Sequence, residues 1–255
     1  SNYHGVTLPA AVSTPTGRFY PYHFNVTELV AGQLQPYCST ASGFAYSGQD
    51  IHWDLAPVLE IQARNALNNL TQNYTQTGFM KLPLNPAIFS LPATDSSALA
   101  NDGLPVSLTA VINAGNLTTA SAGILNYTLD VLNDTFTYSK ELRAKVSPFQ
   151  PKPILTLSDF KDTDEVNMTG SLTLNISSGF ELRYGRLWLE DSYGPETQTL
   201  RIPARAEYFS GGRFVLNSDD SCWSYDSSVD ASVLPSTLTS VLGNSRTLIS
   251  GRNTD

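Results

Sequence analysis

Acidic side chains are the residues of this sequence whose spacing most suggests chemistry. Four carboxylates lie within seven residues, at Asp159, Asp162, Asp164 and Glu165. Calcium takes several oxygen ligands, and a loop that carries alternate acids supplies them. The segment lacks the full EF-hand series and its fixed glycine, so a solvated acidic turn between strands is the alternative interpretation. The sequence therefore predicts no obligate cofactor and one candidate calcium site.

The aromatic side chains form a second candidate set. Flat indole and phenol rings stack on sugars when they are exposed, and pack into the core when they are not. Trp188 is out of phase with the leucines on either side of it, so we expect it to face the opposite side of its strand. Both interpretations stay open for the candidate ligand-binding residues, which are Trp53, Trp188 and Trp223, with Tyr193 and Tyr225.

The sequence gives little support for a hydrolytic enzyme. The three histidines, His4, His23 and His52, all lie in the first quarter of the chain, and no GxSxG nucleophile motif occurs. A glycosidase needs two carboxylates at a defined separation. Asp219 and Asp220 are available for that role, but the sequence selects no pair. We predict no catalytic residue and expect a protein that is not an enzyme.

The two cysteines, Cys38 and Cys222, are far apart in the chain. They form no CxxC pair and have no histidine beside them, which argues against zinc. In an exported protein they would be joined in one long-range disulfide. Two buried free thiols, or pairing with cysteines outside this chain, are the alternatives.

Composition limits the class of partner. The 255 residues carry a formal net charge of -8, and only 15% of them are charged. Nucleic-acid binding requires clustered lysine and arginine, which this chain lacks. No apolar run reaches the 18 residues that a membrane helix needs, so we expect no direct membrane insertion.

Period-two alternation indicates the elements that must position these residues. Apolar and polar side chains alternate through residues 199–208, which predicts a half-buried antiparallel strand. Ser210-Gly211-Gly212 then favours a hairpin turn. Residues 58–67 have no convincing helix cap, and their alternation favours a strand. Gly185 marks a change of parity, where we expect a bulge or kink. Residues 171–217 thus indicate a meander.

The fold class predicted from these patterns is all-β, with two immunoglobulin-like β-sandwich domains of mostly antiparallel strands. Three prolines between Pro148 and Pro153 favour an extended linker. The predicted parts of the chain are a linker or tag-proximal segment at 1–15, a first domain at 16–147, a Pro-rich linker at 148–153, a second domain at 154–235 and a loosely packed tail at 236–255.

Several short phrases, taken in order, resemble the C-terminal region of the MshQ family of MSHA (mannose-sensitive haemagglutinin) type IV pilus biogenesis proteins. The resemblance covers roughly residues 16–226. Ser47 stands where the family phrase would have methionine. The phrases are Arg18-Phe19-Tyr20-Pro21, His23-Phe24, Phe44-Ala45-Tyr46-Ser47-Gly48-Gln49, Ala63-Arg64-Asn65, Thr71-Gln72-Asn73-Tyr74, Arg183-Tyr184-Gly185-Arg186-Leu187, Tyr193-Gly194, residues 203–209, Phe214-Val215-Leu216-Asn217 and Asp219-Asp220-Ser221-Cys222.

The resemblance implies a large exported protein at the cell surface or in the periplasm of a Gram-negative bacterium. It supplies no catalytic residue, because the function of this family region is itself unknown. The expected role is a structural or interaction module whose partners are other pilus or cell-surface proteins. A carbohydrate-binding adhesin domain is the rival hypothesis, and a glycoside-acting enzyme comes third.

Overall fold

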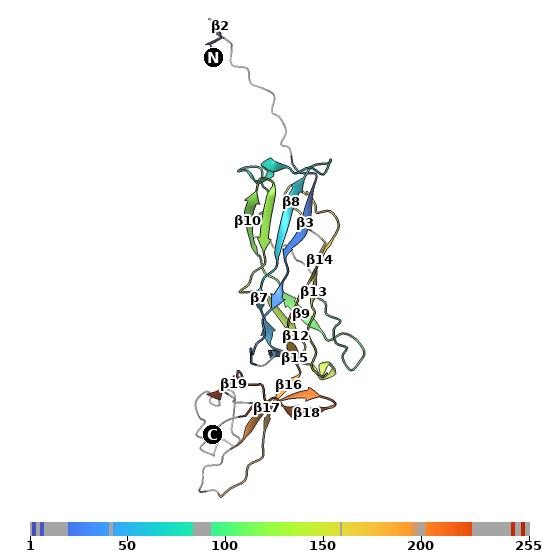
Figure 1. Ribbon diagram of the computed structural model, residues 1–255, viewed down its shortest axis with the longest axis vertical. Coiled ribbons are helices and arrows are strands. Elements are labelled where there is room, and N and C mark those ends of the chain that lie inside the picture. Colours follow the sequence, from blue (N-terminus) through green and yellow to red (C-terminus); the bar gives the residue numbers. More distant parts are fainter. Residues whose placement is uncertain are drawn as a thin grey trace.

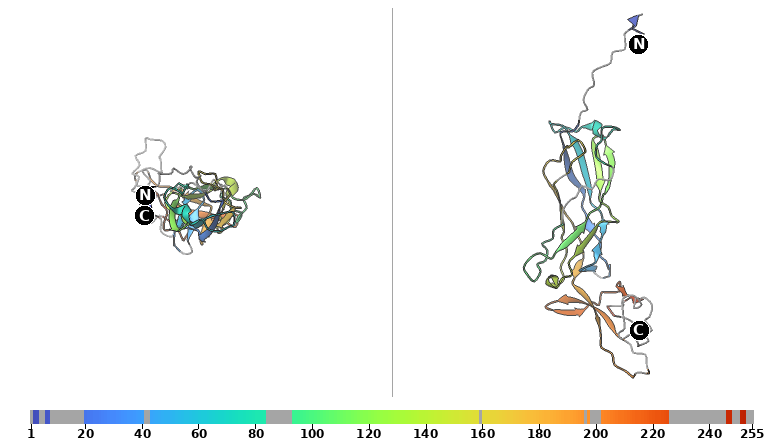
Figure 2. Two further views of the ribbon diagram at one scale, coloured as in Figure 1. Left: turned by 90° about the horizontal axis from the view of Figure 1, so that it is seen from above. Right: turned by 180° about the vertical axis from the view of Figure 1, so that it is seen from behind.

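The molecule is elongated, with a large β-sheet unit above a small one when its long axis is vertical (Figure 1). We call residues 20–182 the large unit and residues 183–252 the small unit. Seen along the long axis, the two units overlap closely (Figure 2). The structure, a computed structural model, describes residues 2–3, 6–7, 20–40, 43–83, 93–158, 160–195, 197, 202–225, 246–247 and 251–252.

Nearly all the regular secondary structure is β-strand, and most strand pairs run antiparallel, which confirms the predicted all-β class. The helical elements in the described ranges are two short 3-10 turns, Gln72–Thr75 (η1) and Leu142–Ala144 (η2). Neither they nor any other helix in those ranges has the length and hydropathy needed to cross a membrane.

A four-stranded antiparallel sheet occupies the part of the large unit that is farther from the small unit (Figure 1). Its strand order is β10-β11-β8-β3, with bounds Asn116–Ser121, Ile124–Thr128, Val58–Arg64 and His23–Val30. In β8, Leu59, Ile61 and Ala63 are buried while the residues between them are partly exposed, so the predicted strand is confirmed.

Shorter sheets complete the large unit. A three-stranded sheet of order β6-β12-β9 lies nearer the small unit, with bounds Asp50–Ile51, Thr135–Tyr138 and Leu108–Val111. The remaining pairs are β13 (Ile154–Leu157) with β14 (Leu172–Asn175), β4 (Gln33–Leu34) with β7 (Trp53–Leu55), and β5 (Phe44–Tyr46) with β15 (Glu181–Arg183). Outside this unit lie β1 (Asn2–Tyr3) paired with β2 (Val6–Thr7), and β19 (Ser224–Tyr225) paired with β20 (Arg246–Thr247).

The small unit is built on one antiparallel sheet of order β16-β17-β18, with bounds Gly185–Leu189, Ala204–Ser210 and Arg213–Leu216. Its hairpin turns at Gly211 and Gly212, whose φ angles are 58° and 84°. Positive φ at two consecutive turn residues is the backbone that glycine adopts without strain, so the predicted hairpin is confirmed.

The Pro-rich segment at 148–153 does not divide the hydrophobic core, and the predicted domain boundary there needs correction. Leu155 and Phe160, which follow the segment, belong to the same buried cluster as Phe24 and Leu59, which precede it. The local sequence is linker-like, but β13 and β14 pack back onto the earlier strands. The predicted meander is therefore split, because β14 belongs to the large unit, β15 pairs with β5 and ends at the boundary, and β16 lies in the small unit.

Candidate functional site

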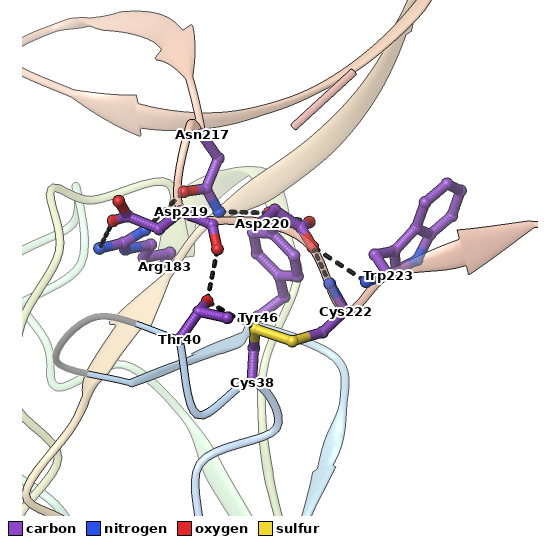
Figure 3. Close-up of a disulfide and its surroundings, with 9 residues drawn as sticks. All are labelled: Cys38, Thr40, Tyr46, Arg183, Asn217, Asp219, Asp220, Cys222 and Trp223. Carbon is purple, nitrogen blue, oxygen red and sulfur yellow. Dashed lines mark hydrogen bonds and ion pairs between the residues drawn. A yellow bond between two sulfur atoms is a disulfide. The ribbon is translucent and has the colours of Figure 1, made fainter. Parts of the chain in front are cut away.

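The candidate site is the junction between the large and small units, where Cys38 and Cys222 are joined in a disulfide (Figure 3). Their Cα atoms are 5.6 Å apart and their separation in sequence is 184 residues. Cys38 is fully buried beside β5. The disulfide predicted as one of three alternatives is thus present, and it connects the two units covalently.

Arg183 occupies the centre of the junction and is only 4% exposed. Its guanidinium donates hydrogen bonds to the side-chain oxygen of Asn217 at 2.5 Å and to carboxylate oxygens of Asp219 at 2.9 Å and Glu181 at 3.0 Å. Burial opposes the charged form of this guanidinium, but the hydrogen bonds to Asp219 and Glu181 outweigh it, so the pKa of Arg183 is raised. Arg183 is the first residue of the small unit, and its strand β15 pairs with β5 of the large unit. Its charged, multiply bonded guanidinium therefore lies at the boundary between the two units.

Aromatic rings enclose the same guanidinium. The Arg183 Cζ atom lies 4.7 Å from the ring centroid of Phe44 and 4.7 Å from that of Tyr208. Phe44 belongs to β5 of the large unit and Tyr208 to β17 of the small one. Cation–π contacts of this kind strengthen when they are desolvated. Arg183 thus joins one aromatic side chain from each unit.

A second buried chain of hydrogen bonds runs beside the disulfide (Figure 3). Asn217 donates its side-chain N–H to the Tyr46 hydroxyl at 2.5 Å, and that hydroxyl donates to Asp220 Oδ2 at 2.8 Å. The other oxygen of Asp220 accepts the backbone N–H groups of Cys222 at 3.1 Å and Trp223 at 2.9 Å. Asp220 therefore folds the segment around Cys222 and also holds it against β5.

Burial and the neighbouring Asp220 raise the pKa of Tyr46 well above its ordinary value. The hydroxyl accordingly stays protonated and remains a donor across the physiological range. Because both partners of Tyr46 belong to the small unit, this phenol is a polar contact that fixes the orientation of one unit on the other.

Gly185 lies where the chain passes from the large unit to the small one. A Cβ atom at this position would lie 2.3 Å from a ring carbon of Tyr46. Only glycine leaves room for the backbone to approach that ring so closely. The change of parity predicted at Gly185 coincides with the point where β15, which pairs with β5, ends and β16, which pairs with β17, begins.

Two family models divide the chain at this same place. Residues 1–182 match the model described as DUF6701, third domain, and residues 183–254 match the model described as DUF6701, fourth domain. The chain belongs to the DUF6701 family. No curated protein and no solved structure matches it. The large unit is therefore the third domain and the small unit the fourth, and the domain boundary lies at 182/183, not at 148–153.

The three tryptophans do not form one binding surface. Trp53 is buried in the third domain, where its indole N–H donates to Asp134 Oδ2 at 3.0 Å and its ring packs edge-on against Phe136. Of the two interpretations kept open for Trp53, core packing is therefore the correct one and the ligand platform is not, because its ring is buried in the core. Trp223 lies next to the disulfide in the fourth domain.

Trp188 lies on β16 of the fourth domain and is 41% exposed. The Arg186 guanidinium carbon is 4.5 Å from its ring centroid and 3.8 Å from that of Phe214. Glu207 accepts hydrogen bonds from Arg186 and from Arg205, so one face of this sheet carries alternating cations, carboxylates and rings. Trp188 is the tryptophan of the three that retains a half-exposed aromatic surface.

A cavity of about 210 Å³ lies between the two domains. Trp223 and Arg186 line it from the fourth domain, and Tyr46, Gln49 and Lys140 line it from the third. Trp223, one of the candidate ligand-binding residues, thus lies beside the junction. The sequence did not predict that junction.

The acidic segment is folded as a tight turn. Asp162 is buried, and its Oδ1 accepts the backbone N–H groups of Asp164 at 2.9 Å and Val166 at 3.1 Å. Its Oδ2 accepts the Tyr74 hydroxyl at 2.8 Å. Asp159 lies outside the described residues. These contacts favour the turn over the calcium site, since both oxygens of Asp162 already have protein partners.

Glu165 belongs to the same turn, with a φ of 61°, and forms an exposed ion pair with Lys161. No group of three or more potential metal ligands is found in the part of the chain that the structure describes. Asp219 and Asp220, the other acidic candidates, lie at the junction, where they accept hydrogen bonds from Arg183 and Tyr46. No chemical role was predicted for Arg183, Tyr46 or Asn217, because their partners across the junction lie far away in the chain. The phrases that resemble the MshQ family contain all three residues, which is the one local signal that could have marked them.

Proposed function

We propose that this chain is a non-enzymatic structural module, a rigid spacer in an exported surface protein associated with a type IV (MSHA) pilus. The junction is the observation that carries the proposal. A disulfide, the packing of the buried Arg183 guanidinium against Phe44 and the Tyr46–Asp220 hydrogen bond join the third and fourth domains at one place. Buried polar networks have directional requirements, so they hold one relative orientation of the two domains.

The shape of the molecule supports a spacer role. Strand β3 begins near one end of the long axis, and the sheet of the fourth domain lies at the other end (Figure 1). The backbone N–H of Gly251 donates to the carbonyl of Asp220, so the last described residues also lie on the fourth domain. A partner attached before β3 and one attached after Gly251 would thus be held apart by the length of both domains.

The disulfide and the resemblance to the MshQ family support the proposed location. Disulfides persist in oxidising compartments such as the periplasm and the cell surface. We therefore place the chain at the surface or in the periplasm of a Gram-negative bacterium, with other pilus or cell-surface proteins as its partners.

A carbohydrate-binding adhesin is the second candidate, and the half-exposed ring of Trp188 favours it. A glycan array with the oxidised chain tests the two functions against each other, with Trp188→Ala as the matched variant. A spacer gives no specific binding with either protein. Specific hits that Trp188→Ala abolishes would support the adhesin and contradict a purely structural role.

A further inference from the structure

We propose that the Cys38–Cys222 disulfide makes this chain a load-bearing element, in which tension passes around both domains through the S–S bond. The inference rests on the proposed spacer function, since a spacer at a cell surface is pulled from both ends. The load path runs from the N-terminal side to Cys38, crosses to Cys222 and continues toward the C-terminal side. Residues 39–221 form a closed loop outside this path.

The first part of the load path is strand β3, which runs along the long axis of the molecule (Figure 1). Seven register pairs, from His23↔Arg64 to Val30↔Val58, connect β3 to β8. On its other side, Phe24 exchanges backbone hydrogen bonds with the segment around Met168. Antiparallel ladder bonds are perpendicular to the strand, so tension along β3 loads many of them together in shear.

The last part of the load path returns to the fourth domain. The backbone N–H of Gly251 donates to the Asp220 carbonyl at 2.6 Å, and Ala206 donates to the Gly251 carbonyl at 2.8 Å. A Cβ atom at residue 251 would lie 2.1 Å from the carbonyl oxygen of Asn217, so glycine permits this close docking. Tension from the C-terminal side detaches this segment and then stops at Cys222.

The disulfide shields a connection between the domains that has little β-pairing of its own. Among the described residues, the β-register pair that crosses the 182/183 boundary is Arg183↔Tyr46, at the end of the β5–β15 pairing, and the chain continues into β16 at Gly185. Without the disulfide, tension would pass through this crossing and separate the fourth domain from the third. With it, the crossing lies inside the closed loop and carries no load.

The proposal sets a limit on extension. A loop of sequence separation 184 represents roughly 600–660 Å of contour length that stays inaccessible while the disulfide is intact. Roughly 70 residues lie outside the loop and provide at most about 250 Å. Once the disulfide is broken, we expect the part of the fourth domain inside the loop, residues 183–221, to release first, in a step of roughly 130–140 Å.

Optical-tweezers pulling on the oxidised chain, with handles on its two ends, tests the proposal. The comparison is the same molecule after reduction in the instrument, together with Cys38→Ser/Cys222→Ser. Reduction of a protein that folded oxidised keeps the test valid even where the double variant fails to fold. Forced unfolding follows the unfolding barrier along the pulled path, so the two states should differ in both force and extension.

We expect the oxidised chain to stop extending at about 250 Å and the reduced chain to extend by the further 600–660 Å. Full extension of the oxidised chain, or no added extension after reduction, would overturn the load-bearing role. Either result leaves the spacer function standing, because the glycan array tests that function separately. Glycan binding, conversely, would contradict the spacer and leave the load path unchanged.

Discussion

The core of the third domain and its junction with the fourth domain are stabilised by different interactions. The core consists of buried apolar and aromatic side chains, such as Phe24, Leu59 and Leu155, contributed by strands throughout residues 20–182. The junction has one disulfide and a buried set of charged and amide groups around Arg183. The junction also contains a small apolar cluster, in which Phe44 and Tyr46 pack with Tyr208. The chain thus uses apolar burial in both places and adds directional bonds where the two domains meet.

This difference explains why the junction can define the orientation of the fourth domain relative to the third. Apolar burial is non-directional and roughly proportional to area, so it tolerates small rotations of one body on another. Hydrogen bonds to a buried guanidinium require fixed geometry, and a partner left without its bond is costly. A spacer needs the fixed geometry of such hydrogen bonds at the junction between its two domains.

Removal of the disulfide should have the largest effect. For Cys38→Ala/Cys222→Ala we expect the free energy of unfolding to fall by about 2–5 kcal/mol, because closure of so long a loop restricts the unfolded chain. Urea denaturation monitored by tryptophan fluorescence measures this change. Reducing agent should lower the stability of the wild type and leave the variant unchanged. Equal stabilities of the two oxidised proteins would show that the bond contributes nothing.

Replacement of Arg183 should cause the second largest loss of stability. Arg183→Met leaves Asn217 and Asp219 without their cation, and we expect a loss of about 2–3 kcal/mol, below the value for a fully buried pair because Asp219 is partly exposed. Arg143→Met is the matched control, since Arg143 forms exposed ion pairs with Glu141 and Asp102, and exposed pairs contribute little to stability. Similar losses in the two variants would contradict the central place of Arg183.

Loss of a single hydroxyl at the junction should have a smaller effect. Tyr46→Phe removes the donor to Asp220 and the acceptor for Asn217, at a cost of about 1–3 kcal/mol. Hydrogen exchange should show the loss as faster exchange of the Cys222 and Trp223 amides, with the β8 amides unaffected. Tyr193→Phe, at a highly exposed position, is the control and should change neither.

The smallest effect concerns pH and the core of the third domain. Burial raises the pKa of Asp134 above 3.8, even though Trp53 and Asn113 donate to it. The folded state therefore binds a proton more readily than the unfolded state, and the contribution of Asp134 to stability falls as pH rises from 3.8 through its folded pKa. The slope of unfolding free energy against pH should be more positive in Asp134→Asn than in the wild type. Identical slopes would contradict this account of Asp134.

The elements predicted correctly are those that local physics determines. Alternation in residues 58–64 marks β8, and Gly211-Gly212 marks the hairpin, because each signal comes from neighbouring residues. The predicted domain boundary at 148–153 is wrong, because prolines indicate an extended backbone but do not show what the following strands pack against. Among the site residues, the pairing of Cys38 with Cys222 was one of three alternatives that the sequence allowed, and the structure shows it.

Arg183 and Tyr46 could not be found in this way. Arg183 stands in a strand next to Leu182 and Tyr184, and alternation predicts only a polar position there. Of its hydrogen-bond partners only Glu181 is local, while Asn217 and Asp219 lie 34 and 36 residues away. The partners of Tyr46 lie 171 and 174 residues away. Such pairing depends on the fold as a whole, so it becomes visible only in three dimensions.

The most direct test of the rigid spacer is the distance distribution between its two domains. Single-molecule FRET between dyes on Thr119 of β10 and Arg213 of β18, both exposed, measures it when the dyes are attached through non-natural amino acids that leave the cysteines intact. The oxidised chain should give one narrow distribution, and Arg183→Met in reducing conditions should give a broad one. A broad distribution in the oxidised wild type would contradict the account.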